Sequence, residues 1–316
     1  MNPQQLLSDM AEFMETFHPF RSEAAKQTYL AFYEEKARRW PVASETRMVN
    51  TSFGDTFVWI QGPVDGPKLV LMPGDSENSL SWMPLIEALS AEHRTYVLDH
   101  IYDNGRSVYT KAPQGPSDLV QWLDELFATL ELERLSLVGY SYGGWQAALY
   151  ALSHPHRLEK LVLIAPSATV LPPPIGLLIR AFAYYFIPLR FVTKKYLYWW
   201  GPDAVRNVQT RSRIDEMIEE LMLARKCFKR RKFVPPTVLT DRDWQALSAP
   251  TLFLVGENEL NYSATKAVDR LAAVAPTVTT SIAANADHYV AMVKPKWVTD
   301  QVLKFLNGSE SPLLLG

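Results

Sequence analysis

The sequence has 316 residues, of which 47% are hydrophobic and 21% are charged, and this composition is typical of a globular protein with one large core. Its formal net charge of -2 argues against a dedicated nucleic-acid binder, which carries a concentrated basic surface. The single cysteine, Cys227, excludes an internal disulfide and favours a reducing compartment, the cytoplasm.

Residues 1–44 are expected to form a helical extension. Within residues 5–39, apolar side chains recur at helical spacing, at Leu6, Met10, Phe13, Met14 and Phe17. The same stretch carries Asp9, Glu12 and Glu15, whereas a signal peptide needs a basic start and an unbroken apolar core. The N-terminus therefore predicts an amphipathic helix and not a signal peptide.

Strands and helices alternate over residues 45–165. The first β-rich runs are "TRMVNTSF", "TFVWIQG", "KLVLMP" and "RTYVLD", and the pair Gly54-Asp55 between the first two predicts a hairpin. A helix near 117–130 precedes the strand "RLSLVG", and the helix after Ser141 precedes the strand "KLVLIA". This alternation predicts an α/β fold with a mostly parallel sheet that helices cover on both faces.

The alternation stops over residues 166–247, which open with "PSATVLPPP" and hold amphipathic helices rich in aromatic residues. After Pro250 it resumes with the strand "TLFLVG", a helix near 263–275, the strand "TVTTSI" and a helix near 296–306. We therefore expect a core made of residues 45–165 and 248–306. The interval 166–247 is expected to be a helical cap above the C-terminal ends of the strands, and residues 307–316 a loose tail.

Ser141 lies in the sequence "LVGYSYGGW", which fits G-x-S-x-G between a predicted strand and a predicted helix. A serine on such a tight turn has its Oγ exposed, and the flanking Gly139 and Gly143 remove side chains that would collide with neighbouring backbone. A glycine-serine turn without chemistry is the alternative reading. The strand, the helix and a third glycine, Gly144, favour a nucleophile.

A serine nucleophile needs a base, usually histidine, that a carboxylate orients. Of the six histidines, His288 follows the last predicted strand, at the sheet edge where sites of open α/β folds gather. The orienting acid is expected between Ser141 and His288 in chain order. The sequence "TLFLVGENELNYS" offers Glu257 and Glu259 for this role.

These motifs resemble those of the alpha/beta-hydrolase superfamily, in its capped serine esterase-like branch. The matching pieces are "LVLMPGDSENSLSW", "YVLDHIYDNGRS", "LVGYSYGGW", "PTLFLVGENEL" and "ADHYVAMVKP", within residues 45–306. In this family the acid loop commonly reads G-E-x-D, and the resemblance places Glu259 at the position of the triad carboxylate, with glutamate in place of aspartate. Glu257 is the reserve candidate.

The resemblance also implies an oxyanion hole made of backbone N–H groups. Relatives usually carry His-Gly before the first donor residue, and this sequence has Pro73-Gly74 there. The first donor is then the N–H of Asp75 and the second is the N–H of Tyr142. Since a carboxylate would repel the developing oxyanion, the Asp75 side chain is expected to point away.

Other signals have two readings each. The basic run "RKCFKRRK", residues 225–232, fits either a phosphate or anionic-membrane patch or the solvated face of a cap helix, and acidic residues just before it favour the helix. The aromatic runs "FAYYFIPLRF" and "YLYWW" are expected to line an acyl pocket and to form the core of the cap. Residues 175–192 are interrupted by Arg180, Pro188 and Arg190, so no stable membrane insertion is expected.

The sequence contains no G-x-G-x-x-G, no P-loop and no Cys/His metal spacing, so we expect neither cofactor nor metal. The predicted function is that of a serine hydrolase cleaving small to medium carboxylic esters through an acyl-enzyme intermediate. Its partner is then a small-molecule ester. C–C bond hydrolase, lactonase and perhydrolase activities on the same triad remain alternatives, as does a hydrolase-like ligand receptor with little turnover.

Overall fold

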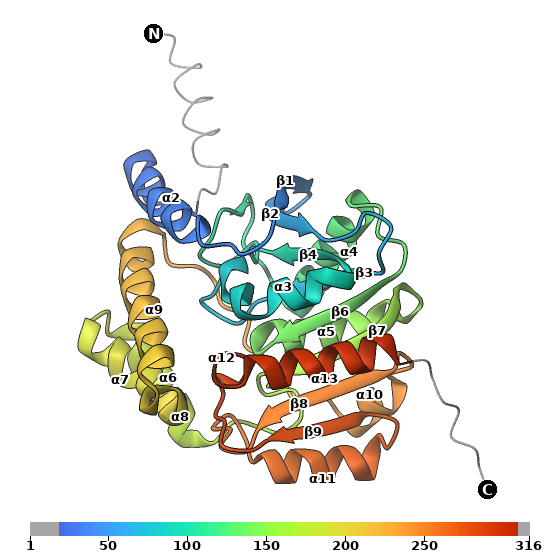
Figure 1. The fold of residues 1–316 in the computed structure, drawn as a ribbon. Helices are drawn as coiled ribbons and strands as arrows, with labels where there is room; N and C mark the ends of the chain where they lie inside the picture. The colour runs from blue at the N-terminus through green and yellow to red at the C-terminus, as the bar shows by residue number, and fades with distance from the viewer. Residues whose placement is uncertain (1–18, 309–316) are drawn as a thin grey trace, which may run out of the picture.

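The computed structural model describes residues 19–308 (Figure 1). The first described helix is α2, Glu23–Ala37, which begins after Ser22, whose hydroxyl accepts a hydrogen bond from the N–H of Ala25. Residues 19–22 are not helical, so the expectation of helical structure within residues 5–39 is wrong for these four residues and confirmed for α2. The apolar positions expected before them lie outside the described residues, as does the tail after residue 308.

One sheet runs through the molecule in the order β1-β2-β4-β3-β6-β7-β8-β9, with the short β5 paired to β2. The pairs β1–β2, β2–β4 and β2–β5 are antiparallel, and the remaining neighbours are parallel. The strands are β1 Ser44–Thr51, β2 Gly54–Gln61, β3 Lys68–Met72, β4 Arg94–Leu98, β5 Val108–Tyr109, β6 Leu135–Tyr140, β7 Leu158–Ile164, β8 Thr251–Gly256 and β9 Thr279–Ala283.

The expected hairpin lies between β1 and β2, where Thr51 pairs with Gly54. Gly54 adopts a φ of 126°, and a Cβ there would lie 2.3 Å from the carbonyl oxygen of Val108. Both the turn and the packing of β5 therefore require glycine at this position.

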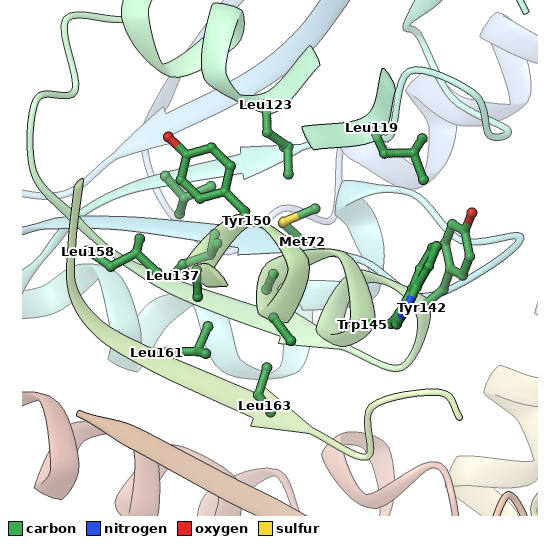
Figure 2. Packing of buried hydrophobic residues seen from close by; sticks show 14 of the residues in the cluster. Met72, Leu119, Leu123, Leu137, Tyr142, Trp145, Tyr150, Leu158, Leu161 and Leu163 are labelled. Atoms are coloured by element: carbon green, nitrogen blue, oxygen red, sulfur yellow. The ribbon is translucent and has the colours of Figure 1, made fainter. Parts of the chain in front are cut away.

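Helices cover both faces of the sheet, as expected for this strand pattern (Figure 1). On one face, Trp145 and Tyr150 of α5 pack with Leu119 and Leu123 of α4 against strand residues such as Leu137 (Figure 2). On the other face, α3 and α13 form a second apolar cluster. The bounds are α3 Met83–Glu92, α4 Pro116–Thr129, α5 Tyr142–Ser153, α11 Ala264–Val274, α12 Val290–Val293 and α13 Pro295–Asn307; short 3-10 turns span Ser79–Trp82 and Pro155–Arg157.

The segment between β7 and β8 is helical, although these two strands are direct parallel neighbours. Helix α9 packs against α7, α8 and α2, and in Figure 1 these helices lie to one side of the sheet. Across the described residues, no helix is both long and apolar enough to cross a membrane. The bounds are α6 Ile175–Phe186, α7 Arg190–Trp200, α8 Pro202–Arg206, α9 Val208–Cys227 and α10 Asp241–Ala246.

The aromatic residues of this helical segment divide into two groups. Tyr184 stacks on Tyr196 with ring centroids 4.5 Å apart, and both are half-buried. Phe182 and Phe186 are exposed by 64% and 51% instead. The expectation that these aromatic residues form the core of the cap is therefore wrong for Phe182 and Phe186.

Candidate active site

Ser141 occupies a sharp turn between the end of β6 and the start of α5. Its φ of 51° lies in the left-handed region, which costs free energy for a residue with a side chain. A Cβ on Gly139 would lie 2.3 Å from the Gly143 carbonyl oxygen, and one on Gly143 would lie 2.4 Å from that of Pro73. Both glycines are therefore required for the backbone to turn this tightly, and the turn projects the serine from the end of the strand.

Ser141, His288 and Glu259 form one hydrogen-bonded chain. The Ser141 Oγ lies 2.9 Å from the His288 Nε2, and the His288 Nδ1 lies 2.9 Å from one carboxylate oxygen of Glu259 and 3.0 Å from the other. All three residues are buried, with 6–7% of each exposed. The proton on Nδ1 is then held by the carboxylate, which leaves Nε2 free to accept the hydroxyl proton of the serine.

The backbone fixes the carboxylate of Glu259 at the end of β8. Its Oε1 accepts hydrogen bonds from the N–H groups of Leu260, at 2.9 Å, and Asn261, at 2.8 Å. Glu257 lies elsewhere, because its exposed carboxylate accepts from the N–H of Asn285 at 2.9 Å. Of the two candidate acids, the structure therefore brings Glu259 and not Glu257 to the imidazole.

The environment of His288 has opposing effects on its protonation. Burial lowers the pKa of the imidazole, whereas the charge of Glu259 and its hydrogen bond raise it, and the net result is a raised pKa. The ring is held between two aromatic side chains: that of Trp200, at the end of α7, lies 4.4 Å away, and that of Tyr140 lies 5.7 Å away. The Tyr140 hydroxyl also donates to the His288 carbonyl oxygen at 2.9 Å.

The loop after β3 lies beside this chain. The backbone N–H groups of Asp75 and Tyr142 form no hydrogen bond within residues 19–308, so these two groups are free to bind an oxyanion. The Asp75 carboxylate accepts from the hydroxyl of Ser76 and forms an ion pair with the guanidinium of Arg231. Its negative charge is thus matched by a cation that comes from the helical segment.

Arg231 corrects one expectation about the basic run 225–232. Helix α9 ends at Cys227, so the residues after it leave the helix. The Arg231 side chain is only 17% exposed and donates to the buried carboxylate of Asp103 at 2.9 Å and to the Tyr102 carbonyl oxygen at 3.0 Å. The Arg231 guanidinium is therefore part neither of a solvated helix face nor of an open anion-binding patch, because it is already paired with the carboxylates of Asp75 and Asp103.

Two further polar groups near Ser141 were not expected from the sequence. The hydroxyl of Ser167 lies 2.9 Å from the Ser141 Oγ. Glu77 accepts from the N–H of Gly74 at 3.2 Å, and burial raises the pKa of this carboxyl to about 7 against the effects of that bond and of His288. The acidic sequence "PGDSENS" contained Glu77, but nothing in it indicated that the side chain turns back onto its own loop.

The other described histidines make no hydrogen bond to Ser141. The His100 ring is buried between Gln146 and Trp122, and His93 is buried at the start of β4. His154 and His156 lie at the far end of α5, as expected, and His18 lies outside the described residues.

A cavity of about 690 Å³ adjoins the site between α2, α3, α9 and α12. Tyr140 and Tyr289, the neighbours in sequence of Ser141 and His288, form its inner wall, but Ser141 and His288 themselves do not line it. Its apolar walls include Leu80, Trp82, Met217, Leu221 and Met292.

Known proteins resemble this chain in sequence and in architecture. A sequence model of the alpha/beta hydrolase family matches residues 69–301. Carboxylesterase YbfK of Bacillus subtilis is 30% identical over 290 residues, which cover 90% of this chain and 96% of that protein. The uncharacterized carboxylesterase nap of the same organism is 28% identical over 88% of this chain and 92% of its own length.

Solved structures agree with the sequence comparison. The crystal structure of carboxylesterase CesB (YbfK) from Bacillus subtilis superposes with a TM-score of 0.81 at 27% identity, over 91% of this chain and 100% of that one. The naproxen esterase (carboxylesterase NP) from Bacillus subtilis gives the same TM-score and identity, over 90% of this chain and 99% of its own. The sheet order, the turn that carries Ser141 and the family match over most of the sequence lead to one conclusion: this chain belongs to the alpha/beta hydrolase family.

Proposed function

We propose that this chain is a carboxylesterase that cleaves small to medium carboxylic esters through an acyl-enzyme on Ser141. The observation that carries the proposal is the continuous hydrogen-bonded chain from the Ser141 Oγ through His288 to Glu259, on a strained turn. The named relatives, both carboxylesterases, support the same substrate class.

In the first half of the proposed reaction, the Ser141 Oγ attacks the ester carbonyl carbon while His288 Nε2 takes the hydroxyl proton. Glu259 stabilises the imidazolium that forms. The N–H groups of Asp75 and Tyr142 bind the oxyanion of the tetrahedral intermediate. When this intermediate collapses, the C–O bond to the alcohol breaks and His288 returns its proton to the departing alkoxide oxygen.

In the second half, a water molecule attacks the acyl carbon and gives a proton to the same imidazole nitrogen. The second tetrahedral intermediate then releases the carboxylic acid and the proton returns to the Ser141 Oγ. With this water and the ester as the reactants, the three residues of the hydrogen-bonded chain account for every proton that moves.

We further infer that residues 166–247 act as a cap over the site, inserted into a core of residues 45–165 and 248–306. The ring contact between Trp200 and His288 supports this division. The cytoplasm is the compartment we propose, because Cys227 is a free, buried thiol and the sequence has no other cysteine.

A change at Ser141 tests the proposal. Ser141→Ala is expected to lower kcat for a small ester by about 10⁴-fold or more and to abolish labelling by a fluorophosphonate probe. Ser167→Ala removes a neighbouring hydroxyl of the same kind and is the matched control, so this variant should still be labelled. Labelling of Ser141→Ala, or absence of ester turnover by the folded wild-type protein, would refute the esterase proposal.

A further inference from the structure

Helix α6 is apolar on both of its faces. Leu177 and Tyr184 face inward, where Leu177 is buried and Tyr184 stacks on Tyr196. The outward face is exposed by 51–76% at Ile175, Leu178, Ile179, Phe182 and Phe186. A helix that is hydrophobic all round is normally buried, so an exposed face of this kind requires a partner.

A spacing of three or four residues places 175, 178, 179, 182 and 186 on one side of the helix, and we call these residues, together with the exposed 187, 189 and 191 that follow them, the α6 face. The ring centroids of Phe182 and Phe186 lie 4.3 Å apart. Beyond the end of α6 the surface continues through Ile187, Leu189 and Phe191, which are exposed by 43–59%. Isolated exposed apolar residues are common on proteins, whereas a contiguous set on one helix and its following loop marks an interaction site.

The part of the sequence that carries this surface contains basic residues but no acidic ones. The sequence has no Asp or Glu between residues 160 and 202. Arg180 and Lys195 lie on α6 and α7, and the Arg230 guanidinium lies 4.5 Å from the ring centroid of Phe186. Within residues 19–308, none of these three cations forms an ion pair with a carboxylate, whereas the nearby Arg190 is paired with Glu219.

The charge of the α6 face indicates which kind of partner can bind there. A second copy of this chain docking through the same face about a two-fold axis would bring Lys195 and Arg230 of both copies into one interface, and residues 161–201 supply no carboxylate to pair with them. An anionic surface supplies the negative charges that pair with these cations. Helices that rest on lipid combine aromatic and aliphatic residues on the buried side with Lys and Arg at the rim, and here Lys195 lies 6.0 Å from the ring centroid of Phe191 and Arg230 lies 4.5 Å from that of Phe186.

From this pattern we infer that the α6 face binds the surface of an anionic lipid bilayer. The apolar residues enter the boundary between headgroups and acyl chains, and Lys195 and Arg230 contact the lipid phosphates. Helix α7 begins beside this face at Arg190 and ends at Trp200, whose ring lies 4.4 Å from His288. The surface thus lies one helix away from the candidate triad, although binding to lipid does not depend on ester hydrolysis.

Co-sedimentation with vesicles tests the inference without any substrate. The wild-type protein is expected to bind phosphatidylglycerol vesicles, to bind phosphatidylcholine vesicles at least tenfold more weakly, and to lose binding as salt is raised. Ile179→Glu/Phe182→Glu should weaken binding to phosphatidylglycerol by at least tenfold. Met48→Glu/Val64→Glu changes two exposed apolar residues outside the α6 face by the same charge and should bind within twofold of wild type.

A second variant leaves the apolar residues intact. Lys195→Gln/Arg230→Gln should weaken binding to phosphatidylglycerol by about fivefold for each cation removed. The inference is wrong if wild type binds both vesicle types equally, if it binds neither, or if the Met48→Glu/Val64→Glu control loses as much as the α6 variant. Thermal unfolding followed by circular dichroism establishes that each variant is folded.

A fluorescent reporter separates lipid from other occupants. Phe182→Cys in a Cys227→Ser background, labelled with an environment-sensitive dye, should show a blue shift in emission only when phosphatidylglycerol vesicles are added. A blue shift without vesicles that grows with protein concentration would assign the face to a second copy. One that is independent of concentration would assign it to another segment of the same chain, and either result overturns the inference.

Discussion

The imidazole of His288 is held by one carboxylate on one side and one hydroxyl on the other, and its charge state controls the proposed reaction. Nε2 accepts the serine proton only when the ring is neutral. Because Glu259 raises the pKa of the ring, kcat/KM is expected to fall on the acid side at a pH above the usual imidazole value of about 6.5.

Glu259→Gln removes the charge that raises this pKa. The acid limb of kcat/KM should then move to lower pH, since burial is left as the dominant effect, and kcat should fall by about 10⁴-fold through loss of the oriented imidazolium. Glu257→Gln is the matched control, because its carboxylate contacts the Asn285 N–H instead, and should stay within a few-fold of wild type. The pH dependence of ester turnover measures both effects, and equal losses in the two variants would contradict the role of Glu259.

Asp75 and Arg231 carry a second prediction for single residues. Arg231→Met leaves the Asp75 carboxylate without its cation beside the proposed oxyanion site, so kcat should fall by about 10- to 100-fold because like charges repel. Asp75→Asn alone should stay within a few-fold of wild type. Asp75→Asn/Arg231→Met should recover the part of the loss that comes from the Asp75 charge, whereas the buried Asp103 carboxylate still lacks its cation.

Steady-state kinetics on the three variants form a double-mutant cycle. Lys232→Met is the control, since this neighbouring cation contacts Gln114 and not the active-site loop. If Asp75→Asn/Arg231→Met is as slow as Arg231→Met, the arginine acts by holding the loop in place and not by neutralising the carboxylate.

The turn motif, the chain order and the ends of strands identify Ser141 and His288 in the sequence and leave Glu257 and Glu259 as candidate acids, and the resemblance to the alpha/beta-hydrolase superfamily selects Glu259. The role of Arg231 could not be predicted from the sequence. The side chain of Arg231 reaches Asp75 across 156 residues, and it does so because α9 ends at Cys227 and the chain then turns inward. No local pattern in "RKCFKRRK" distinguishes that arginine from its neighbours.

At the scale of elements, the strands were predictable because both faces of a central parallel strand are buried. Strands β6 and β8 are buried at every position and read as short apolar runs between polar turns. Helix α6 is equally apolar, but its hydrophobicity does not tell which face is covered. Only the structure therefore shows which face of α6 is exposed.

The elbow between β6 and α5 gives a prediction about elements. Gly143→Ala would place a Cβ 2.4 Å from the Pro73 carbonyl oxygen, so α5 and the loop after β3 must move apart. We expect a loss of about 1–3 kcal/mol in the free energy of unfolding, and a lower kcat, because the N–H of Tyr142 moves with the helix.

Urea unfolding and ester turnover measure the two effects. Gly176→Ala is the control: its Cβ would meet only the flexible Arg180 guanidinium, at 3.2 Å, and alanine suits a helix better than glycine. Its unfolding free energy should be unchanged or higher. A Gly143→Ala variant as stable and active as wild type would show that the elbow tolerates a side chain.

On the scale of the whole molecule, polar pairs connect elements that lie far apart in the sequence. Helix α2 is bound to α9 by the ion pair of Lys36 with Glu220 and by the Tyr29 hydroxyl, which donates to the same carboxylate at 3.1 Å. Arg231 joins the segment after α9 to the loops that follow β3 and β4. Alternating strands and helices indicate the sheet, but they carry no information about such pairs.

Stability against pH tests this buried polar interior at His100. Burial, followed by the charge of Arg231, lowers the pKa of this imidazole to about 3, whereas in the unfolded chain it is about 6.5. Between these values the unfolded chain binds a proton that the folded protein does not, so His100 makes stability fall as pH is lowered, by up to about 1.4 kcal/mol per pH unit. Glu77 and Asp103 act oppositely, because burial raises the pKa of each carboxyl to about 7.

The difference between wild type and His100→Gln isolates this single group. Urea unfolding at a series of pH values should give a constant difference in unfolding free energy above pH 7. Below about pH 6.5, wild type should lose stability relative to His100→Gln, since only wild type must exclude a proton from that site. His156→Gln, which removes an exposed histidine, is the matched control. A difference between wild type and His100→Gln that stays constant down to pH 4.5 would show that His100 binds its proton equally well in the folded protein.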